Sequence, residues 1–135
     1  MSADTIRRMR DLLKRLRPRV LAVVEAIPEG RVTTYGAIAR RLRATPRQVA
    51  FILSHFTPEQ SAALPWFRVV AANGVISTIK LGETGRRQIA LLRAEGVEVT
   101  LRCRIIDFDQ VFWQPQGQQN PRKAAKKVAP STRAK

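Results

Sequence analysis

Residues 33–56 read TTYGAIARRLRATPRQVAFILSHF, and this stretch decides the fold. Thr33 or Thr34 supplies a hydroxyl that caps a first helix, which we expect to run to about Leu42. Thr45 caps a second helix, and the proline that follows suits its first position. Because only two residues separate the helices, the pattern predicts a helix-turn-helix. Many helical hairpins bind nothing, so this geometry alone leaves the function open.

The second helix has an apolar stripe and a polar face. Its predicted buried positions are Val49, Ile52, Leu53 and Phe56. Arg47 lies about 200° around the helix from Val49, so it points away from that stripe. Gln48 borders the same outward face. A capped helix with Arg and Gln in its first turn is typical of a phosphate- or base-contacting helix, although a solvated face has the same pattern.

The N-terminal flank predicts a basic amphipathic helix over residues 1–17 that stops near Pro18. Its apolar residues recur at helical spacing: Ile6, Met9, Leu12, Leu13 and Leu16. The cations between them are Arg7, Arg8, Arg10, Lys14, Arg15 and Arg17. Pro18 suits the first turn of a second, largely buried helix that runs to about Ile27.

The C-terminal flank predicts short strands and one more helix. Asn73-Gly74 is a dipeptide typical of hairpin turns. We therefore expect a strand over 68–70, a return strand over 75–78, a helix over about 86–94, short strands over 97–99 and 105–108, and a closing segment over 111–113. Residues 57–64 are expected to form a loop.

These elements predict a mainly α fold with a small β component, in a single winged helix-turn-helix-like domain. We divide the chain into a basic N-terminal helical extension (1–17), the domain itself (18–115) and a basic tail (116–135). The tail has six cations, no acidic residues and no aromatic residues. Such a segment is expected to be disordered and to seek phosphates, or to serve only solubility.

The charge balance points to a polyanionic partner. Lys and Arg total 25 against 10 for Asp and Glu, which gives a formal net charge of +15. Because self-repulsion at that charge destabilises a compact chain, nucleic acid is the first candidate partner and an anionic membrane surface the second. A solubilising basic surface or a ribosome-associated chain remains open on composition alone.

Several classes of site and location are disfavoured by the sequence. Cys103 is the single cysteine and His55 the single histidine, so we expect no disulfide, no metal site and no cofactor; the simplest reading of Cys103 is a half-buried strand thiol. No apolar run approaches the roughly 20 residues of a membrane span, and no signal-type segment follows the N-terminus. We expect a cytoplasmic, nucleoid-associated protein, by default a monomer.

Five segments in order resemble the DNA-binding domain of the O6-alkylguanine-DNA alkyltransferase family. They are IPEGRVTTYGAIA (27–39), PRQV (46–49), PWFRV (65–69), NGVIS (73–77) and LRAEGV (92–97). The likeness covers roughly residues 18–115 with near-family spacing, and its strength comes from several motifs in register rather than any one of them.

The decisive motif departs from the repair enzymes of that family. Those enzymes carry Pro-Cys-His-Arg-Val, and the cysteine accepts the alkyl group after activation by the histidine and a carboxylate. Here Trp66 stands in the place of the cysteine and Phe67 in that of the histidine, while Glu95 matches the carboxylate. The chain is most similar to the alkyltransferase-like proteins, in which tryptophan replaces the nucleophile and which pass the lesion to nucleotide-excision repair. Phe67 departs even from those, because they usually keep the histidine.

The resemblance implies two sets of site residues and no catalytic residue. Arg47 would enter the duplex and fill the gap left by a flipped nucleotide, while Tyr35 would push on the adjacent phosphate. The DNA-binding set is Thr34, Tyr35, Thr45, Arg47, Gln48 and Arg68. The lesion-pocket set is Tyr35, Trp66, Phe67, Val69, Ser77 and Lys80. Related proteins often have an arginine near the position of Ile79, and Lys80 would partly substitute for it. Without the family likeness, Trp66 would be interpreted as an ordinary core aromatic.

The expected function is recognition of O6-alkylguanine in double-stranded DNA without repair, with nucleotide-excision repair proteins as downstream partners and no membrane. The alternative is a winged-helix transcription regulator or architectural DNA-binding protein with no lesion preference. Two further rivals are a working alkyltransferase that uses Cys103 and a structural RNA-binding protein.

Overall fold

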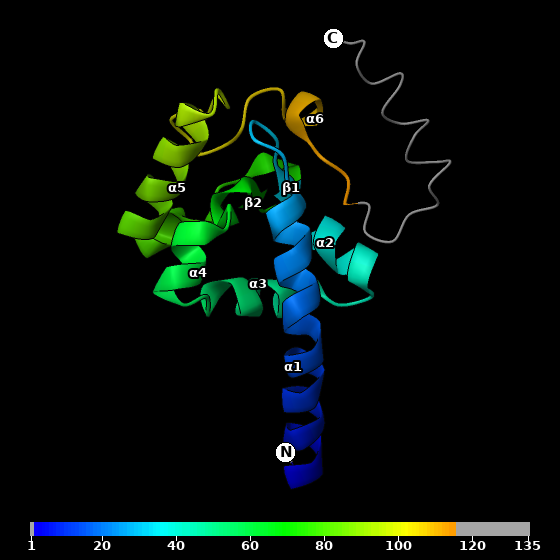
Figure 1. The fold of residues 1–135 in the computed structure, drawn as a ribbon. Coiled ribbons are helices and arrows are strands. Elements are labelled where there is room, and N and C mark those ends of the chain that lie inside the picture. Colours follow the sequence, from blue (N-terminus) through cyan, green and yellow to red (C-terminus); the bar gives the residue numbers. More distant parts are fainter. Residues whose placement is uncertain (1, 116–135) are drawn as a thin grey trace, which may run out of the picture.

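The computed structural model describes residues 2–115, apart from the side chains of Ile79 and Leu81 (Figure 1). The tail predicted for 116–135 lies outside the described residues. The elements are α1 (Ala3–Ala26), β1 (Thr33–Thr34), α2 (Tyr35–Leu42), α3 (Pro46–Ser54), α4 (Pro58–Ala63), η1 (Trp66–Arg68), β2 (Val69–Val70), η2 (Ala72–Gly74), η3 (Ser77–Leu81), α5 (Glu83–Ala94) and α6 (Phe108–Val111). This arrangement confirms the predicted mainly α fold with a small β component.

The N-terminal segment differs from expectation at Pro18. The predicted helix over 1–17 does form, but it does not stop there: α1 continues through the proline to Ala26, and the predicted boundary at 17/18 falls inside it. A proline inside a helix removes one backbone hydrogen bond and costs about 3 kcal/mol. Burial on both sides of Pro18 offsets that cost, because Leu16 and Val20 are 3% and 0% exposed and lie four residues apart on one face.

The helix-turn-helix forms as the cap residues predicted. The Thr34 hydroxyl accepts a hydrogen bond from the Ala37 N–H (2.9 Å) and starts α2. The Thr45 hydroxyl accepts one from the Gln48 N–H (3.1 Å), and the Gln48 side-chain oxygen accepts one from the Thr45 N–H (3.0 Å). This capping box starts α3, with proline in its first turn. Arg43 ends α2 in the left-handed conformation (φ 58°), which turns the chain sharply between the helices.

The loop expected over 57–64 is instead mostly helical. Thr57 and Gln60 form a second capping box, and a proline at the first position makes α4 a copy of the start of α3. The Gln60 side chain also accepts a hydrogen bond from the Arg17 Nη2 (2.7 Å), so α4 is tied to α1. The cap and the proline at the first position therefore form a helix here despite the polar composition of the segment.

The return strand expected over 75–78 is also wrong. Asn73 and Gly74 do reverse the chain at positive φ (63° and 81°), and a Cβ at Gly74 would lie 3.0 Å from the Phe108 ring. However, β2 pairs in parallel with β1, with Thr33 opposite Val69. Residues after the turn make only an isolated antiparallel bridge between Val75 and Arg104, and then enter η3.

The remaining C-terminal predictions hold in part. The third helix begins at Glu83 rather than 86, and the strands expected near 97–99 and 105–108 reduce to one bridge between Val99 and Ile105. Cys103 is half-buried as expected, but it lies in a turn at φ 62° rather than in a strand. The closing segment packs as predicted, and the Trp113 N–H donates to the Val32 carbonyl (2.7 Å).

Two apolar clusters hold the domain together. The first joins α1, α2 and α3 through residues that include Val20, Ile38 and Ile52. The second lies between α5 and the segments around β2, and includes Ile76 and Leu92. The turn η1 and strand β2 run between these two clusters, because Val69 belongs to the first and Val70 to the second.

Candidate functional site

A cavity of about 330 Å³ opens where the helix-turn-helix meets η1 and η3. This volume lies at the small end of the range for small-molecule pockets. Its lining residues are Tyr35 from α2, Ala50, Leu53 and Ser54 from α3, Trp66 from η1, Ser77, Thr78 and Lys80 from η3, and Thr84 from α5. Four of the six residues predicted for the pocket therefore line one cavity: Tyr35, Trp66, Ser77 and Lys80.

The other two predicted pocket residues lie elsewhere. Phe67 packs against the second apolar cluster, and Val69 is 1% exposed within the first. A 3₁₀ turn has three residues per turn, so successive side chains point about 120° apart. Only the Trp66 indole of this turn faces the cavity, and the Phe67 ring meets it edge-on with 6.0 Å between ring centroids.

Tyr35 forms part of the cavity wall at the start of α2. Burial raises the pKa of its phenol above the ordinary value of 10.0, and a hydrogen bond with the Ser77 side chain acts in the opposite direction. The phenol is therefore neutral at physiological pH, and its hydroxyl is held by η3. This contact joins the start of α2 to η3 within the cavity lining.

Gln88 was not among the predicted site residues, but its side chain supports the wall of the cavity. Its side chain is 1% exposed, and its Nε2 donates to the carbonyls of Phe67 (2.9 Å) and Val69 (3.0 Å). Its Oε1 accepts a hydrogen bond from the Thr78 hydroxyl, which lines the cavity. One buried amide thus joins α5, η1 and η3. The available signal was a glutamine one residue before Ile89 and four before Leu92, on the apolar side of the helix.

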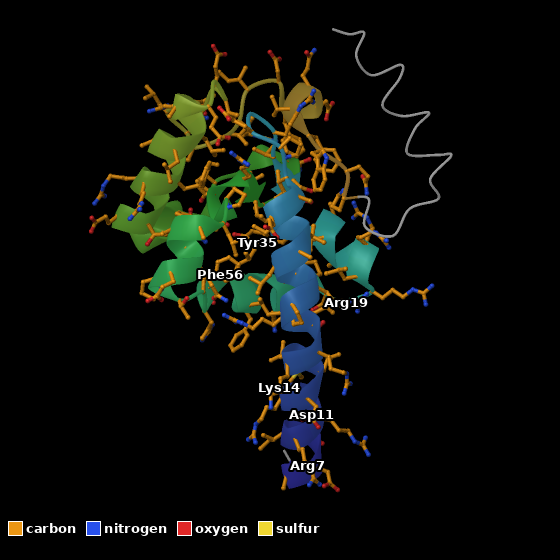
Figure 2. The ribbon with its side chains drawn as sticks, in the orientation of Figure 1. Arg7, Asp11, Lys14, Arg19, Tyr35 and Phe56 are labelled. Atoms are coloured by element: carbon orange, nitrogen blue, oxygen red, sulfur yellow. The ribbon has the colours of Figure 1, made fainter. Side chains whose placement is uncertain are left out.

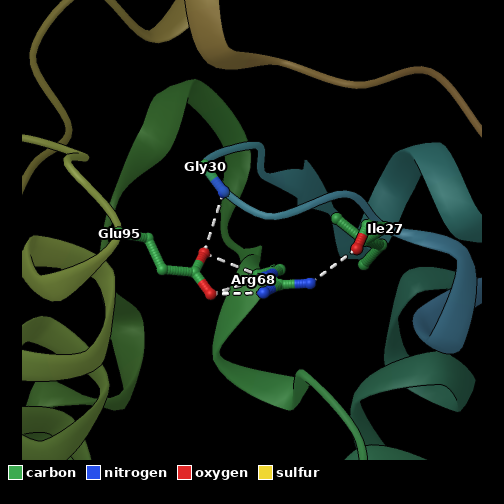
Figure 3. A network of polar contacts seen from close by, with 4 residues as sticks. All are labelled: Ile27, Gly30, Arg68 and Glu95. Atoms are coloured by element: carbon green, nitrogen blue, oxygen red, sulfur yellow. Dashed lines mark hydrogen bonds and ion pairs between the residues drawn. The ribbon is translucent and has the colours of Figure 1, made fainter.

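The Arg68 side chain is not part of the cavity lining. It belongs to a largely buried network of polar contacts (Figure 3). Its guanidinium forms an ion pair with Glu95, donating from Nε to both carboxylate oxygens (2.9 and 3.1 Å), and its Nη1 donates to the Ile27 carbonyl (2.7 Å). Glu95 also accepts a hydrogen bond from the Gly30 N–H (3.0 Å). Both charged side chains are buried, at 15% and 11% exposure.

This network revises the expectation that Arg68 contacts DNA. Its guanidinium donors are turned to Glu95 and to a backbone carbonyl, so the side chain ties η1 to α1 and to the end of α5. Arg68 also lies over the Phe67 ring, with 5.3 Å from its Cζ to the ring centroid. Glu95, which matches the carboxylate of the repair enzymes in sequence, is the ion-pair partner of Arg68.

The outward face of α3 borders the cavity. Arg47 is exposed in the first turn of α3, and residues three and seven positions further on share its face. Those residues are Ala50 and Ser54, both of which line the cavity. Arg47 therefore lies on the face of α3 that borders the cavity. Thr34, Thr45 and Gln48 use their side-chain oxygens in the two caps, which leaves nearby backbone N–H groups of the helix starts as anion-binding groups.

Residues 15–97 match the family described as 6-O-methylguanine DNA methyltransferase, DNA binding domain. This match covers more than half of the chain. The chain belongs to this family. The resemblance read from the five sequence segments is confirmed.

Two curated relatives sharpen the placement within the methyltransferase DNA-binding family. The DNA base-flipping protein of Escherichia coli (strain K12) is 48% identical over 98 residues, which cover 70% of this chain and 71% of that protein. Alkyltransferase-like protein 1 of Schizosaccharomyces pombe is 34% identical over 102 residues, which cover 72% of this chain and 93% of that protein.

A solved structure supports the same placement. It is the crystal structure of S. pombe Atl1 in complex with damaged DNA containing O6-carboxymethylguanine. The TM-score is 0.65 at 32% identity, and the match covers 76% of this chain and 97% of that one. The fold is therefore similar to that of this solved relative.

The lining of the cavity defines the chemical groups that it presents. Among the described residues, its lining contains no cysteine and no histidine, and Cys103 lies in a turn against the second apolar cluster. Within residues 2–115 no three His, Cys, Asp or Glu side chains gather into a potential metal site. No helix of this part of the chain combines the length and apolar character needed to cross a bilayer. The cavity offers an indole face, hydroxyls and one ammonium group.

Proposed function

We propose that this protein recognises O6-alkylguanine in duplex DNA by accepting the flipped nucleotide into the cavity beside Trp66, and that it transfers no alkyl group. The observation that carries this proposal is the position of the Trp66 indole, which lines a cavity bordered by the outward face of α3. Two relatives support it: one is a DNA base-flipping protein, and another was solved in complex with damaged DNA.

In this mechanism α3 approaches the minor groove, where readout of normal sequence is degenerate and damage in any context is accessible. The starts of α2 and α3 present backbone N–H groups to phosphates. Arg47 enters the stack and fills the gap left by the extruded nucleotide. Flipping costs a few kcal/mol, and less for a poorly paired alkylguanine, so part of the selectivity comes from the lesion itself.

Inside the cavity, the indole stacks on the flipped base and contacts the O6-alkyl group. Stacking on an aromatic side chain contributes about 1–3 kcal/mol per base. Tyr35, held by Ser77, forms the opposing wall, and the exposed Lys80 ammonium lies at the rim where it reaches the lesion or its phosphate. The absence of a thiol from the described lining supports binding without transfer.

The basic ends enlarge the electrostatic footprint. The projecting part of α1 and the six cations of residues 116–135 add phosphate contacts, and each neutralised phosphate contributes about −0.9 to the slope of log affinity against log salt. Deleting residues 116–135 should weaken binding to damaged and undamaged duplex alike and flatten this slope. A change in lesion preference alone would contradict this role of the tail.

We further propose that the protein acts as a cytoplasmic, nucleoid-associated monomer and marks lesions for nucleotide-excision repair. Support comes from the charge of +15 and from the sequence likeness to alkyltransferase-like proteins.

The deciding experiment titrates the full chain with two duplexes of one sequence, one of which carries a single O6-methylguanine. We expect tighter binding to the lesion duplex, and increased fluorescence of a 2-aminopurine placed opposite it when the nucleotide flips. Equal affinities would favour a regulator or architectural protein. Intact-mass measurement after incubation with the lesion duplex should show an unchanged protein mass, and a gain of one methyl group would establish an alkyltransferase.

A further inference from the structure

A second apolar hollow lies on the opposite side of α3 from the cavity, between α3 and the N-terminal half of α1. It has a volume of about 500 Å³. Its apolar lining consists of Ile6, Met9 and Leu13 from α1 and Phe51 and Ile52 from α3. We call this hollow the α1–α3 groove. It shares no lining residue with the cavity beside Trp66.

The groove is open to solvent along its apolar floor. Ile6, Met9 and Phe51 are 45%, 45% and 48% exposed. Figure 2 shows why: the first turns of α1, marked by Arg7, Asp11 and Lys14, project beyond the body of the domain. Helices of soluble proteins normally bury their apolar stripe, and a contiguous exposed one marks a binding surface. Phosphates of a duplex account for cations on α1 but not for this apolar floor.

The rim of the groove is positive. Arg10, Lys14 and Arg17 complete its lining. Arg17 is fixed in place, since its Nη2 donates to the His55 carbonyl (3.2 Å) and to the Gln60 side chain (2.7 Å). Asp4 and Asp11 are the acidic residues of α1 before Pro18, and Asp4 pairs with Arg7.

The positive charge of the rim decides which occupant fits the α1–α3 groove: a second copy of the chain, residues 116–135 or a partner protein. A second copy of the chain would bring the same row of cations against itself. Residues 116–135 carry six cations and no acidic residue, so they are repelled as well. Like charges brought face to face are unfavourable, whereas a negative surface is complementary. We infer that the groove binds an acidic amphipathic helix of a partner protein, whose apolar stripe covers Met9 and Phe51 and whose carboxylates meet the basic rim.

The probe is a fluorescein-labelled synthetic helix of about 15 residues, with leucines at positions i, i+3, i+4 and i+7 and glutamates on the other face. It is titrated against the full chain by fluorescence anisotropy. A control peptide has the same composition in an order that disperses the leucines, so it keeps the charge and loses the stripe. We expect the patterned peptide to bind at least about tenfold more tightly. Equal affinities would mean general attraction to a basic protein and would overturn the proposal.

Matched protein variants locate the binding surface. Met9→Gln with Phe51→Gln removes apolar surface at exposed positions and should weaken the patterned peptide about tenfold. Leu101→Gln makes the same kind of change at a residue that is 97% exposed and outside the groove, and should have no effect. Circular dichroism verifies that each variant is folded. An equal effect of both changes would overturn the assignment to the groove.

Other occupants give different results. Dimerisation in analytical ultracentrifugation that Met9→Gln abolishes would assign the groove to a second copy. A membrane is the occupant if the protein binds vesicles of anionic phospholipid through Met9 and Phe51 and shows no preference between the two peptides. Either of these two results would overturn the proposal. Trp66→Ala should leave peptide binding unchanged, because Trp66 is outside the groove. Failure of lesion binding and failure of peptide binding are therefore separable.

Discussion

The cavity beside Trp66 and the network around Arg68 lie on two sides of the same 3₁₀ turn, yet one is open and the other is closed. On the open side, an indole, a phenol and an ammonium group line a space of about 330 Å³. On the closed side, a guanidinium and a carboxylate at 15% and 11% exposure satisfy each other and two backbone groups. Phe67 lies between them and contacts both neighbours.

The comparison distinguishes side chains that are available to a ligand from side chains that hold the fold together. Trp66 in the cavity is half-buried and borders open space, so we expect it to be replaceable without loss of folding. A charge in the network is not, because its partner would be left buried and unpaired. A substitution at Trp66 should therefore change the chemistry of the open side, while the closed side continues to hold η1 against α1 and α5.

The largest expected effect comes from breaking the closed side. Glu95→Ala leaves the Arg68 guanidinium buried without its carboxylate, and we expect a loss of about 3–5 kcal/mol in the free energy of unfolding. Urea denaturation measures this loss. Glu98→Ala, an exposed glutamate three residues away, is the matched control and should change stability by less than about 0.5 kcal/mol. Similar small effects of both variants would refute the structural role of the pair.

Arg47→Ala tests the approach to the open side. The side chain is exposed, so stability should be unchanged, while affinity for duplex DNA should fall by about ten- to a hundredfold through loss of the residue that fills the vacated stack. Anisotropy titration measures affinity, and the 2-aminopurine signal measures flipping. Arg86→Ala, an exposed arginine of α5 outside the cavity lining, serves as the charge-matched control. Equal losses of DNA affinity in the two variants would mean that Arg47 contributes only its positive charge.

Trp66→Ala tests the wall of the cavity. We expect the ratio of affinities for O6-methylguanine and guanine duplexes to fall about tenfold, because stacking is worth about 1–3 kcal/mol per base. Affinity for undamaged DNA should change little. Trp66→Phe keeps an aromatic face and should recover part of the preference. If both variants kept the full preference, the lesion would bind somewhere other than this cavity.

The smallest effect concerns Tyr35 at high pH. Burial raises its folded-state pKa above 10.0, so the neutral phenol contributes stability that is fully present below pH 10 and is lost as the pH rises through the raised value. Because Tyr35 is the single tyrosine, its ionisation is read directly from tyrosinate absorbance. Tyr35→Phe should be more resistant than the wild type to unfolding above pH 10. A wild-type titration at the ordinary tyrosine pKa would contradict the burial of this phenol.

Local signals predicted the part of the fold where they are strongest. The threonine caps before α2 and α3 are hydrogen bonds within three residues, so the sequence reports them directly. The proline at 18 and the turn at 73–74 were misread because distant contacts decide the outcome there. Burial of Leu16 and Val20 outweighs the proline, and β2 pairs in parallel with the distant β1 instead of antiparallel with a hairpin partner.

The candidate site was predictable only through the resemblance. No periodicity places Trp66 beside Tyr35 and Ser77, since three separate segments meet there. Phe67, Val69 and Arg68 do not line the cavity. The directions of the Phe67 and Arg68 side chains depend on the pitch of η1, and Val69 lies in β2 within the first apolar cluster. Ala50, Ser54 and Thr84 were missed because small side chains carry no distinctive signal, although Ala50 and Ser54 follow Arg47 at helical spacing.

The passage of α1 through Pro18 makes the N-terminal projection continuous with a helix of the domain. Its 24 residues extend for about 36 Å at 1.5 Å per residue, with the inner end fixed in the first apolar cluster. A donor fluorophore attached near residue 7 therefore turns together with the cavity. Energy transfer from it to an acceptor at either end of a short duplex would reveal the polarity with which the protein is seated on the strand that carries the damage.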